Sequence, residues 1–116
     1  MLIVYGIKNC DKVKKLINEL NNEEITFDFY DYKKKLPLVE HIKRWESFLG
    51  ELPVNKRGTT YRKLKLSFES LDNCSKLDFI AQNASMIKRP IVELEEKVLV
   101  IGYNKESILN IKHKIS

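Results

Sequence analysis

The hydrophobic pattern at the start of the chain predicts a buried strand that leads directly into an amphipathic helix. Residues 2–5 form an unbroken apolar run of β-branched and aromatic type, which is typical of a strand buried on both faces. Further on, apolar residues recur at i, i+3, i+4 and i+7, the spacing of one helix face: Val13, Leu16, Ile17 and Leu20. Cys10 therefore lies where the strand turns into the helix, at or beside the helix N-cap.

A second strand and a long helical stretch follow. Residues 25–32 alternate, with Ile25, Phe27 and Phe29 on one side, and predict a strand with one face on the core. Together with the first strand and helix they make a βαβ unit, which implies a parallel pair and a right-handed crossover. Residues 36–84 show only helical patterns, and we expect them to form an all-helical insertion.

Three helices are expected within this insertion. The first opens at residues 36–37 and ends at Gly50, with four apolar residues on one face: Leu38, Ile42, Trp45 and Leu49. Gly58 suggests a turn, and Tyr61 with Leu64 indicates a short helix after it. Phe68 and Leu71 either continue this helix or begin further helical turns. The last of the three contains Leu77, Ile80 and Ala81 and ends near residues 83–85.

Strand signals resume near the end of the chain. Residues 90–94 and 98–101 predict two strands, with a hairpin turn at residues 95–97, although the turn lacks an Asn-Gly pair. Ile108, Ile111 and Ile115 indicate a final amphipathic helix. The predicted order is βαβ, helices, ββα, in a single domain spanning residues 1–116.

Composition and charge narrow the possible classes of protein. At 116 residues with 43% hydrophobic positions, the chain is expected to be a soluble globular protein with one core. No apolar run approaches the roughly 20 residues that span a bilayer, and the chain starts directly with a strand, so we expect a cytoplasmic protein with no membrane contact. The net charge is +5, and basic and acidic residues are interspersed along the chain except for one dense basic run at residues 33–35. This distribution favours an anionic small molecule or an acidic protein as partner over nucleic acid.

Cys10 is the main candidate for chemistry. Free backbone N–H groups and the positive end of the helix dipole converge at a helix N-terminus, and four lysines stand nearby: Lys8, Lys12, Lys14 and Lys15. These features favour thiolate over thiol, so we expect Cys10 to have a lowered pKa and to be nucleophilic. The alternative is a small buried hydrophobe, which the polar, tight loop before the helix disfavours.

A family resemblance begins at the same place. Residues 5–11, Tyr-Gly-Ile-Lys-Asn-Cys-Asp, resemble the opening of the glutaredoxin-linked arsenate reductase (ArsC) and Spx family. The resemblance implies an α/β thioredoxin-like fold, in which both halves of the chain join one four-stranded mixed sheet and Cys10 begins the first helix. Val13 stands where a C-x-x-C motif would place its second cysteine. The sequence therefore resembles the monothiol members rather than the dithiol Spx regulators.

Residues 86–92 resemble the element that enters the third strand in this family. The resemblance implies that Pro90 is cis and lies against the active-site cysteine, because sequence alone would not favour a cis bond. It also implies that Arg89 stands beside the thiol, where its guanidinium can bind an oxyanion or a carboxylate through two hydrogen bonds.

Residues 57–64 carry the third part of the resemblance. They most resemble the small uncharacterised YffB-like branch, suspected of being glutathione-dependent thiol reductases, and they imply a second anion-binding arginine at Arg57. Lys8 and Asn9, in the turn before Cys10, complete the expected anion-binding set. Arsenate reductases also have an arginine just after the last strand, where this chain has Lys105 nearby instead; arsenate as the physiological substrate is therefore disfavoured.

The sequence thus predicts a monothiol oxidoreductase that uses the Cys10 thiolate and takes glutathione as co-substrate, or is resolved by a glutaredoxin. One alternative is a Spx-like regulator that binds RNA polymerase without catalysis, and a second is arsenate reduction. Cys74 is expected to be structural or incidental, and His41 and His113 to face solvent. No His/Cys cluster has the spacing of zinc ligands, and no bound cofactor is expected.

Overall fold

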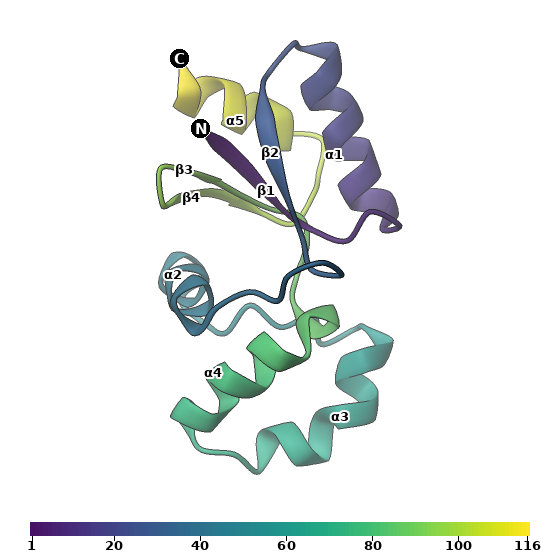
Figure 1. Cartoon of the computed structure of the whole chain (residues 1–116), viewed down its shortest axis with the longest axis vertical. Helices are drawn as coiled ribbons and strands as arrows, with labels where there is room; N and C mark the ends of the chain where they lie inside the picture. The colour runs from purple at the N-terminus through teal and green to yellow at the C-terminus, as the bar shows by residue number, and fades with distance from the viewer. The chain divides into compact units, whose positions relative to one another are not determined.

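A four-stranded mixed sheet is built from both ends of the chain in the computed structural model, which describes residues 1–116. Its strands are β1 (Leu2–Gly6), β2 (Phe27–Asp31), β3 (Ile91–Leu94) and β4 (Lys97–Ile101), in the spatial order β2-β1-β3-β4 (Figure 1). β1 pairs in parallel with β2 and antiparallel with β3, which in turn pairs antiparallel with β4. The predicted α/β fold with one mixed sheet is confirmed.

Two helices pack against one face of this sheet: α1 (Asp11–Asn22) and α5 (Ser107–Ile115). Alternating strand residues and the apolar stripes of both helices form a single core, with these buried members: Leu2, Val4, Leu16, Leu20, Val92, Leu99, Val100 and Ile111. Ile25, Phe27 and Phe29 pack against this core, as their alternation predicts. The apolar stripe of α1 therefore fixes how the helix lies on the sheet, and with it where Cys10 is placed.

The β3–β4 hairpin differs in detail from the sequence prediction. Its turn consists of Glu95 and Glu96 alone, and Lys97 is already the first residue of β4. Both glutamates have left-handed backbone conformations, with φ of 50° and 67°. Positive φ at both positions is the pattern of a type I′ turn, whose twist matches that of the strands. The chain adopts this turn with two glutamates instead of the usual Asn-Gly pair.

The helical residues form a compact unit of their own, Leu36–Lys88, and the sheet with α1 and α5 forms the other, Met1–Lys35 with Arg89–Ser116. The helical unit contains α2 (Val39–Leu49), α3 (Thr59–Glu69), α4 (Asn73–Gln82) and a short 3₁₀ helix, η1 (Ala84–Met86). No helix in the chain has the length and apolar character needed to cross a membrane. The helical unit ends at Lys88, beyond the insertion expected over residues 36–84, and besides its helices it contains one isolated antiparallel bridge, between Val54 and Ile87.

The start of α2 and the length of α3 differ from expectation. α2 begins at Val39, and Leu38 is its N-cap residue, half exposed rather than packed on the helix face with Ile42 and Trp45. The His41 ring caps this end, because its Nδ1 accepts a hydrogen bond from the Leu38 N–H at 2.9 Å. His41 is therefore a capping residue, half-buried rather than fully solvent-facing.

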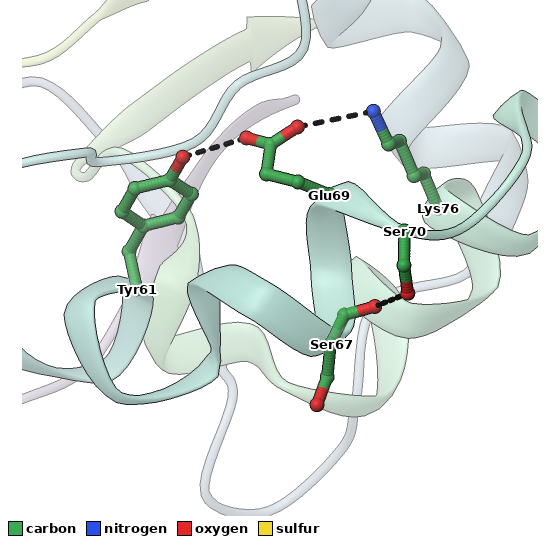
Figure 2. Close-up of polar contacts among 5 residues, drawn as sticks. All are labelled: Tyr61, Ser67, Glu69, Ser70 and Lys76. Atoms are coloured by element: carbon green, nitrogen blue, oxygen red, sulfur yellow. Dashed lines mark hydrogen bonds and ion pairs between the residues drawn. The ribbon is translucent and has the colours of Figure 1, made fainter.

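α3 is one continuous helix of 11 residues, longer than the short helix expected around Tyr61 and Leu64 because Phe68 continues it. The Glu69 carboxylate, in its last turn, accepts hydrogen bonds from the Tyr61 hydroxyl at 2.6 Å and from Lys76 Nζ at 3.2 Å, as Figure 2 shows. Since Lys76 belongs to α4, the carboxylate links the two ends of α3 to the following helix. The Ser70 hydroxyl also bonds the Ser67 carbonyl and closes the end of α3 (Figure 2).

Candidate functional site

Cys10 is the N-cap residue of α1. β1 ends at Gly6, and a tight turn brings the Cys10 N–H to 3.2 Å from the Ile7 carbonyl oxygen. The Cys10 carbonyl then accepts the first helical hydrogen bond, from the Lys14 N–H at 3.0 Å. Cys10 has an extended backbone and a half-buried side chain, while Lys8 and Asn9 occupy the middle of the turn and are exposed. The thiol is thus reachable at the positive end of a helix.

Gly6 allows β1 and the start of α1 to approach closely. A Cβ atom built on Gly6 would lie 2.8 Å from Cγ2 of Val13, much closer than carbon atoms normally approach. Val13 is fully buried, and its β-branched side chain has little freedom to move away. The hydrophobic pattern of the sequence identifies Gly6 only as the residue at which the strand breaks. The structure shows that a larger residue there would displace the helix turn that begins at Cys10.

The surroundings of Cys10 favour its thiolate. Burial raises the pKa of the thiol, but the opposing contributions are larger in sum, and the net pKa is lowered. These come from the backbone N–H groups of Val13 and Lys12 and from the Arg89 side chain, which acts through a hydrogen bond and through its charge. The free N–H groups of the helix N-terminus therefore stabilise a negative sulfur, as the position of Cys10 in the sequence predicts.

Arg89 and Pro90 enter β3 at the same end of the sheet as Cys10. The Arg89–Pro90 peptide bond is cis, so the prediction of a cis Pro90 is confirmed. The Pro90 carbonyl accepts a hydrogen bond from the Gly102 N–H at 2.8 Å, which fixes the backbone beside the end of β4. Arg89 is half-buried and its side chain reaches the sulfur of Cys10. A cation and a nucleophile are thus adjacent.

Arg57, the second predicted anion-binding arginine, lies in the helical unit. It is exposed, in a turn in which its N–H contacts Asn55 Oδ1 at 3.2 Å and the Gly58 N–H contacts the Asn55 carbonyl oxygen at 3.1 Å. Gly58 is the N-cap of α3, so Arg57 directly precedes a helix N-terminus. Its role in binding an anion stays a prediction, as do the roles of Lys8 and Asn9.

Comparison with known proteins decides the family. The model of the ArsC family matches residues 5–111, which is nearly the whole chain. The chain belongs to the ArsC family. An uncharacterised protein of Haemophilus influenzae is 39% identical over 91% of this ArsC-family chain and 94% of its own length. A transcriptional regulator, Spx of Lactiplantibacillus plantarum, is 28% identical over 93% of the chain and 83% of its own length.

Solved structures agree with this membership. A protein described as YFFB superposes with a TM-score of 0.81 and 32% identity, over 94% of this ArsC-family chain and 96% of its own. A possible arsenate reductase from Streptococcus mutans UA159 superposes with a TM-score of 0.75 and 28% identity, over 90% and 92%. The resemblance inferred from residues 5–11, 57–64 and 86–92, including that to the YffB-like branch, is confirmed.

Lys105 lies far from the thiol in this ArsC-family protein. It lines an open groove together with Glu19, from the C-terminal half of α1, and Glu23, the residue that caps the end of this helix. Glu19 follows Cys10 by nine residues, a rise of about 13 Å along the helix. Tyr103 holds the segment after β4 in this place, because its hydroxyl donates a hydrogen bond to Glu19. Lys105 therefore does not place a positive charge beside the thiol, and it does not substitute for the arginine that arsenate reductases have after the last strand.

Cys10 should react as a thiolate over a wider pH range than an ordinary cysteine. Because its pKa is lowered, the rate of alkylation of Cys10 by iodoacetamide should rise with pH and reach its plateau below the pH expected of an ordinary free thiol. The rates can be measured by mass spectrometry of the Cys10 peptide. A Cys10 midpoint at or above the usual value for a free thiol would contradict the stabilisation described above.

Proposed function

We propose that this ArsC-family protein is a monothiol oxidoreductase in which Cys10 reduces a disulfide and glutathione or a glutaredoxin restores the thiol. The observation that carries the proposal is the Cys10 sulfur at the N-cap of α1, with a lowered pKa and with Arg89 beside it. A thiolate at neutral pH is the species that attacks disulfides. The half-exposed side chain allows a substrate to reach it.

The proposed reaction has two stages. The Cys10 thiolate attacks one sulfur of the substrate disulfide, so a mixed disulfide forms and the other sulfur leaves as a thiolate that takes up a proton. In the second stage a glutathione thiolate attacks the Cys10 sulfur of the mixed disulfide, so the remaining substrate sulfur leaves as a thiolate that takes up a proton, and glutathione stays bound to Cys10. A second glutathione thiolate then attacks the sulfur of this bound glutathione, which forms glutathione disulfide and releases the Cys10 thiolate. In sum, one substrate disulfide and two glutathione molecules give two substrate thiols and one glutathione disulfide, and Cys10 returns unchanged.

Arg89 has a distinct role in this reaction. Its guanidinium presents parallel N–H donors, which match the carboxylates of glutathione or an anionic group of the substrate. Beside the Cys10 sulfur, the guanidinium would orient the incoming molecule. It would also stabilise the Cys10 thiolate when this thiolate leaves the mixed disulfide. Val13 occupies the position of a second cysteine, and therefore the resolving thiol must come from outside the chain.

The proposal is tested by mixing the reduced protein with glutathione disulfide and following the intact mass. We expect one glutathione per chain, located on Cys10 by peptide mapping, and its removal when reduced glutathione and a glutaredoxin are added. The Cys74→Ser variant should form the same adduct, whereas Cys10→Ser should form none. An adduct located only on Cys74, or none at all, would refute the proposed reaction.

A second candidate function is regulatory. The likeness to Spx, a transcriptional regulator, extends over nearly the whole chain, and docking to RNA polymerase would not need turnover. This function would be favoured if the protein copurified with RNA polymerase and showed no glutathione-linked activity. Arsenate reduction is less well supported, because Lys105 lies beside the far half of α1 rather than beside Cys10.

A further inference from the structure

The net positive charge of the chain is concentrated in one segment of the helical unit. Between Glu51 and Glu69 there is no acidic residue, and there are five basic ones: Lys56, Arg57, Arg62, Lys63 and Lys65. The other 16 lysines and arginines of the chain equal its 16 acidic residues in number, so the net charge of +5 comes from this segment alone. Neutral residues are interspersed among these cations, which are therefore less conspicuous in the sequence than the run at residues 33–35.

One side of α3 is buried within the helical unit. Phe68 packs against Phe79 of α4 with ring centroids 5.7 Å apart, and Tyr61 lies beside Phe68 with centroids 6.2 Å apart. Tyr61 and Phe68 are both buried. α3 contacts α4 and η1, and Figure 1 shows it beside α4. The opposite side of the helix is left to solvent.

This solvent side has a leucine between cations. Leu66 is 88% exposed, the largest exposed fraction among the large hydrophobic residues of the chain. Arg62 and Lys63 precede it by four and three positions, so all three lie on one helix face, and both cations are exposed. Lys65 is exposed beside them, and none of the three cations makes an ion pair. These four residues form what we name the α3 face.

The cations of the α3 face are arranged unfavourably for the isolated protein. Arg62 and Lys65 are three positions apart, a spacing at which like charges on a helix repel each other. No carboxylate of the chain pairs with either of them. A negatively charged surface laid against α3 would remove this repulsion and add Coulombic attraction, most strongly at low salt. The charge of the α3 face therefore favours an anionic partner.

Leu66 distinguishes between the kinds of anionic partner. A single exposed leucine is common on protein surfaces, but this one stands at the centre of a basic face. Protein interfaces combine an apolar centre with a polar rim, which is the arrangement of Leu66 and its cations. A membrane would need several apolar side chains on the same helix face, whereas Tyr61 and Phe68 are buried on the other side. Nucleic-acid phosphates would bind the cations and leave the leucine without a contact.

We propose that the α3 face binds an acidic protein. Leu66 enters an apolar depression on that partner, and carboxylates around the depression pair with Arg62, Lys63 and Lys65. Burial of the leucine sets how tightly the partner is held, while the cations at the rim raise the rate of association and make it depend on salt. This surface goes beyond the proposed reaction, because its binding needs neither the Cys10 thiolate nor glutathione.

The probe for this surface is a fluorescently labelled synthetic peptide that forms an amphipathic helix, with glutamates on both sides of a stripe of leucines. Its affinity for the full chain is measured by fluorescence anisotropy at low and at physiological salt. We expect binding that weakens as salt is added, and weaker binding of a matched peptide that has serine in place of leucine. No binding at low salt, or equal affinity for the two peptides, overturns the proposal.

Two pairs of variants locate the peptide on the α3 face. Leu66→Ser should weaken binding roughly 10-fold or more, whereas Leu109→Ser, at an exposed leucine of α5, should leave it unchanged. Arg62→Glu should weaken binding at low salt, and much more than Lys34→Glu, which makes the same change of charge at an exposed residue elsewhere. Equal losses in a variant and its control overturn the proposal. Circular dichroism establishes that the compared proteins are folded.

The other anionic occupants are tested with the same variants. A duplex DNA and vesicles that contain phosphatidylserine should bind the parent more weakly than the leucine peptide does at physiological salt, and Leu66→Ser should not alter their binding. Tighter binding of either one, with a loss in Leu66→Ser, overturns the proposal in favour of that occupant. Peptide binding by Cys10→Ser should equal that of the parent, and its loss in this variant, with the fold intact, overturns a surface independent of the thiol.

Discussion

Cys10→Ser is expected to lower glutathione-linked disulfide reduction to the rate measured without protein. A serine hydroxyl at the same N-cap keeps the helix capped, since serine is itself a favoured N-cap residue, but it is not ionised at neutral pH and cannot form a disulfide. The variant should therefore fold like the parent and lose turnover completely. Initial rates with a small-molecule disulfide, glutathione and a coupled glutathione reductase give the measurement.

Cys74→Ser is the matched control for this experiment. Cys74 is an exposed cysteine in the first turn of α4, within the helical unit, and the proposed reaction uses one protein thiol. The control variant should have the turnover of the parent. If it lost turnover with its fold intact, Cys74 would be a resolving cysteine and the monothiol reaction would be wrong.

Arg89→Lys is expected to lower kcat/KM by roughly 10- to 150-fold. Lysine keeps the positive charge but loses the planar fork that forms two parallel hydrogen bonds to a carboxylate or an oxyanion. A hydrogen bond to a charged group contributes on the order of 1.5–3 kcal/mol, and this range corresponds to the stated loss of rate. Steady-state kinetics with a charged and an uncharged disulfide substrate measure the effect, which should be larger for the charged one.

A long-range effect of charge predicts a different pattern. Lysine would then substitute well for Arg89, and added salt would remove most of the remaining difference. Lys8 offers a comparison, because it is an exposed cation in the turn before Cys10, and Lys8→Met should show the small, salt-sensitive change that such an effect produces. Turnover of Arg89→Lys equal to that of the parent would contradict a pocket built on the guanidinium.

The part of the fold that carries Cys10 could be predicted from the hydrophobic pattern. The apolar run of β1 and the stripe of Val13, Leu16 and Leu20 on α1 each specify both an element and its buried face, so the position of Cys10 between them follows. The joining of β3 and β4 to the same sheet could not be predicted this way, because β3 pairs with β1 across about 85 residues of the chain, and such a pairing leaves no local periodicity. The resemblance to the family predicts this joining instead.

Other features depend on tertiary contacts that no local pattern reveals. Glu93 has the residue type of a solvent-facing position, yet it is buried and accepts a hydrogen bond from Tyr5 in another strand. Leu38 matches the apolar spacing of α2 but precedes the helix, because His41 caps the backbone at that residue. The clash that a side chain at Gly6 would make with Val13 likewise exists only once β1 and α1 have packed together.

Val13, the buried residue that packs against Gly6, also determines how the proposed enzyme would respond to the concentration of its reductant. A second cysteine in the chain would attack the mixed disulfide at an effective concentration on the order of millimolar, whatever the surrounding solution contained. Val13 fills that place and is fully buried, so in the proposed reaction each turnover waits for a collision with an external thiol. Turnover would then rise in proportion to free glutathione, and the mixed disulfide on Cys10 would accumulate as the glutathione pool is depleted. The fraction of chains carrying that adduct would thus report the state of the pool.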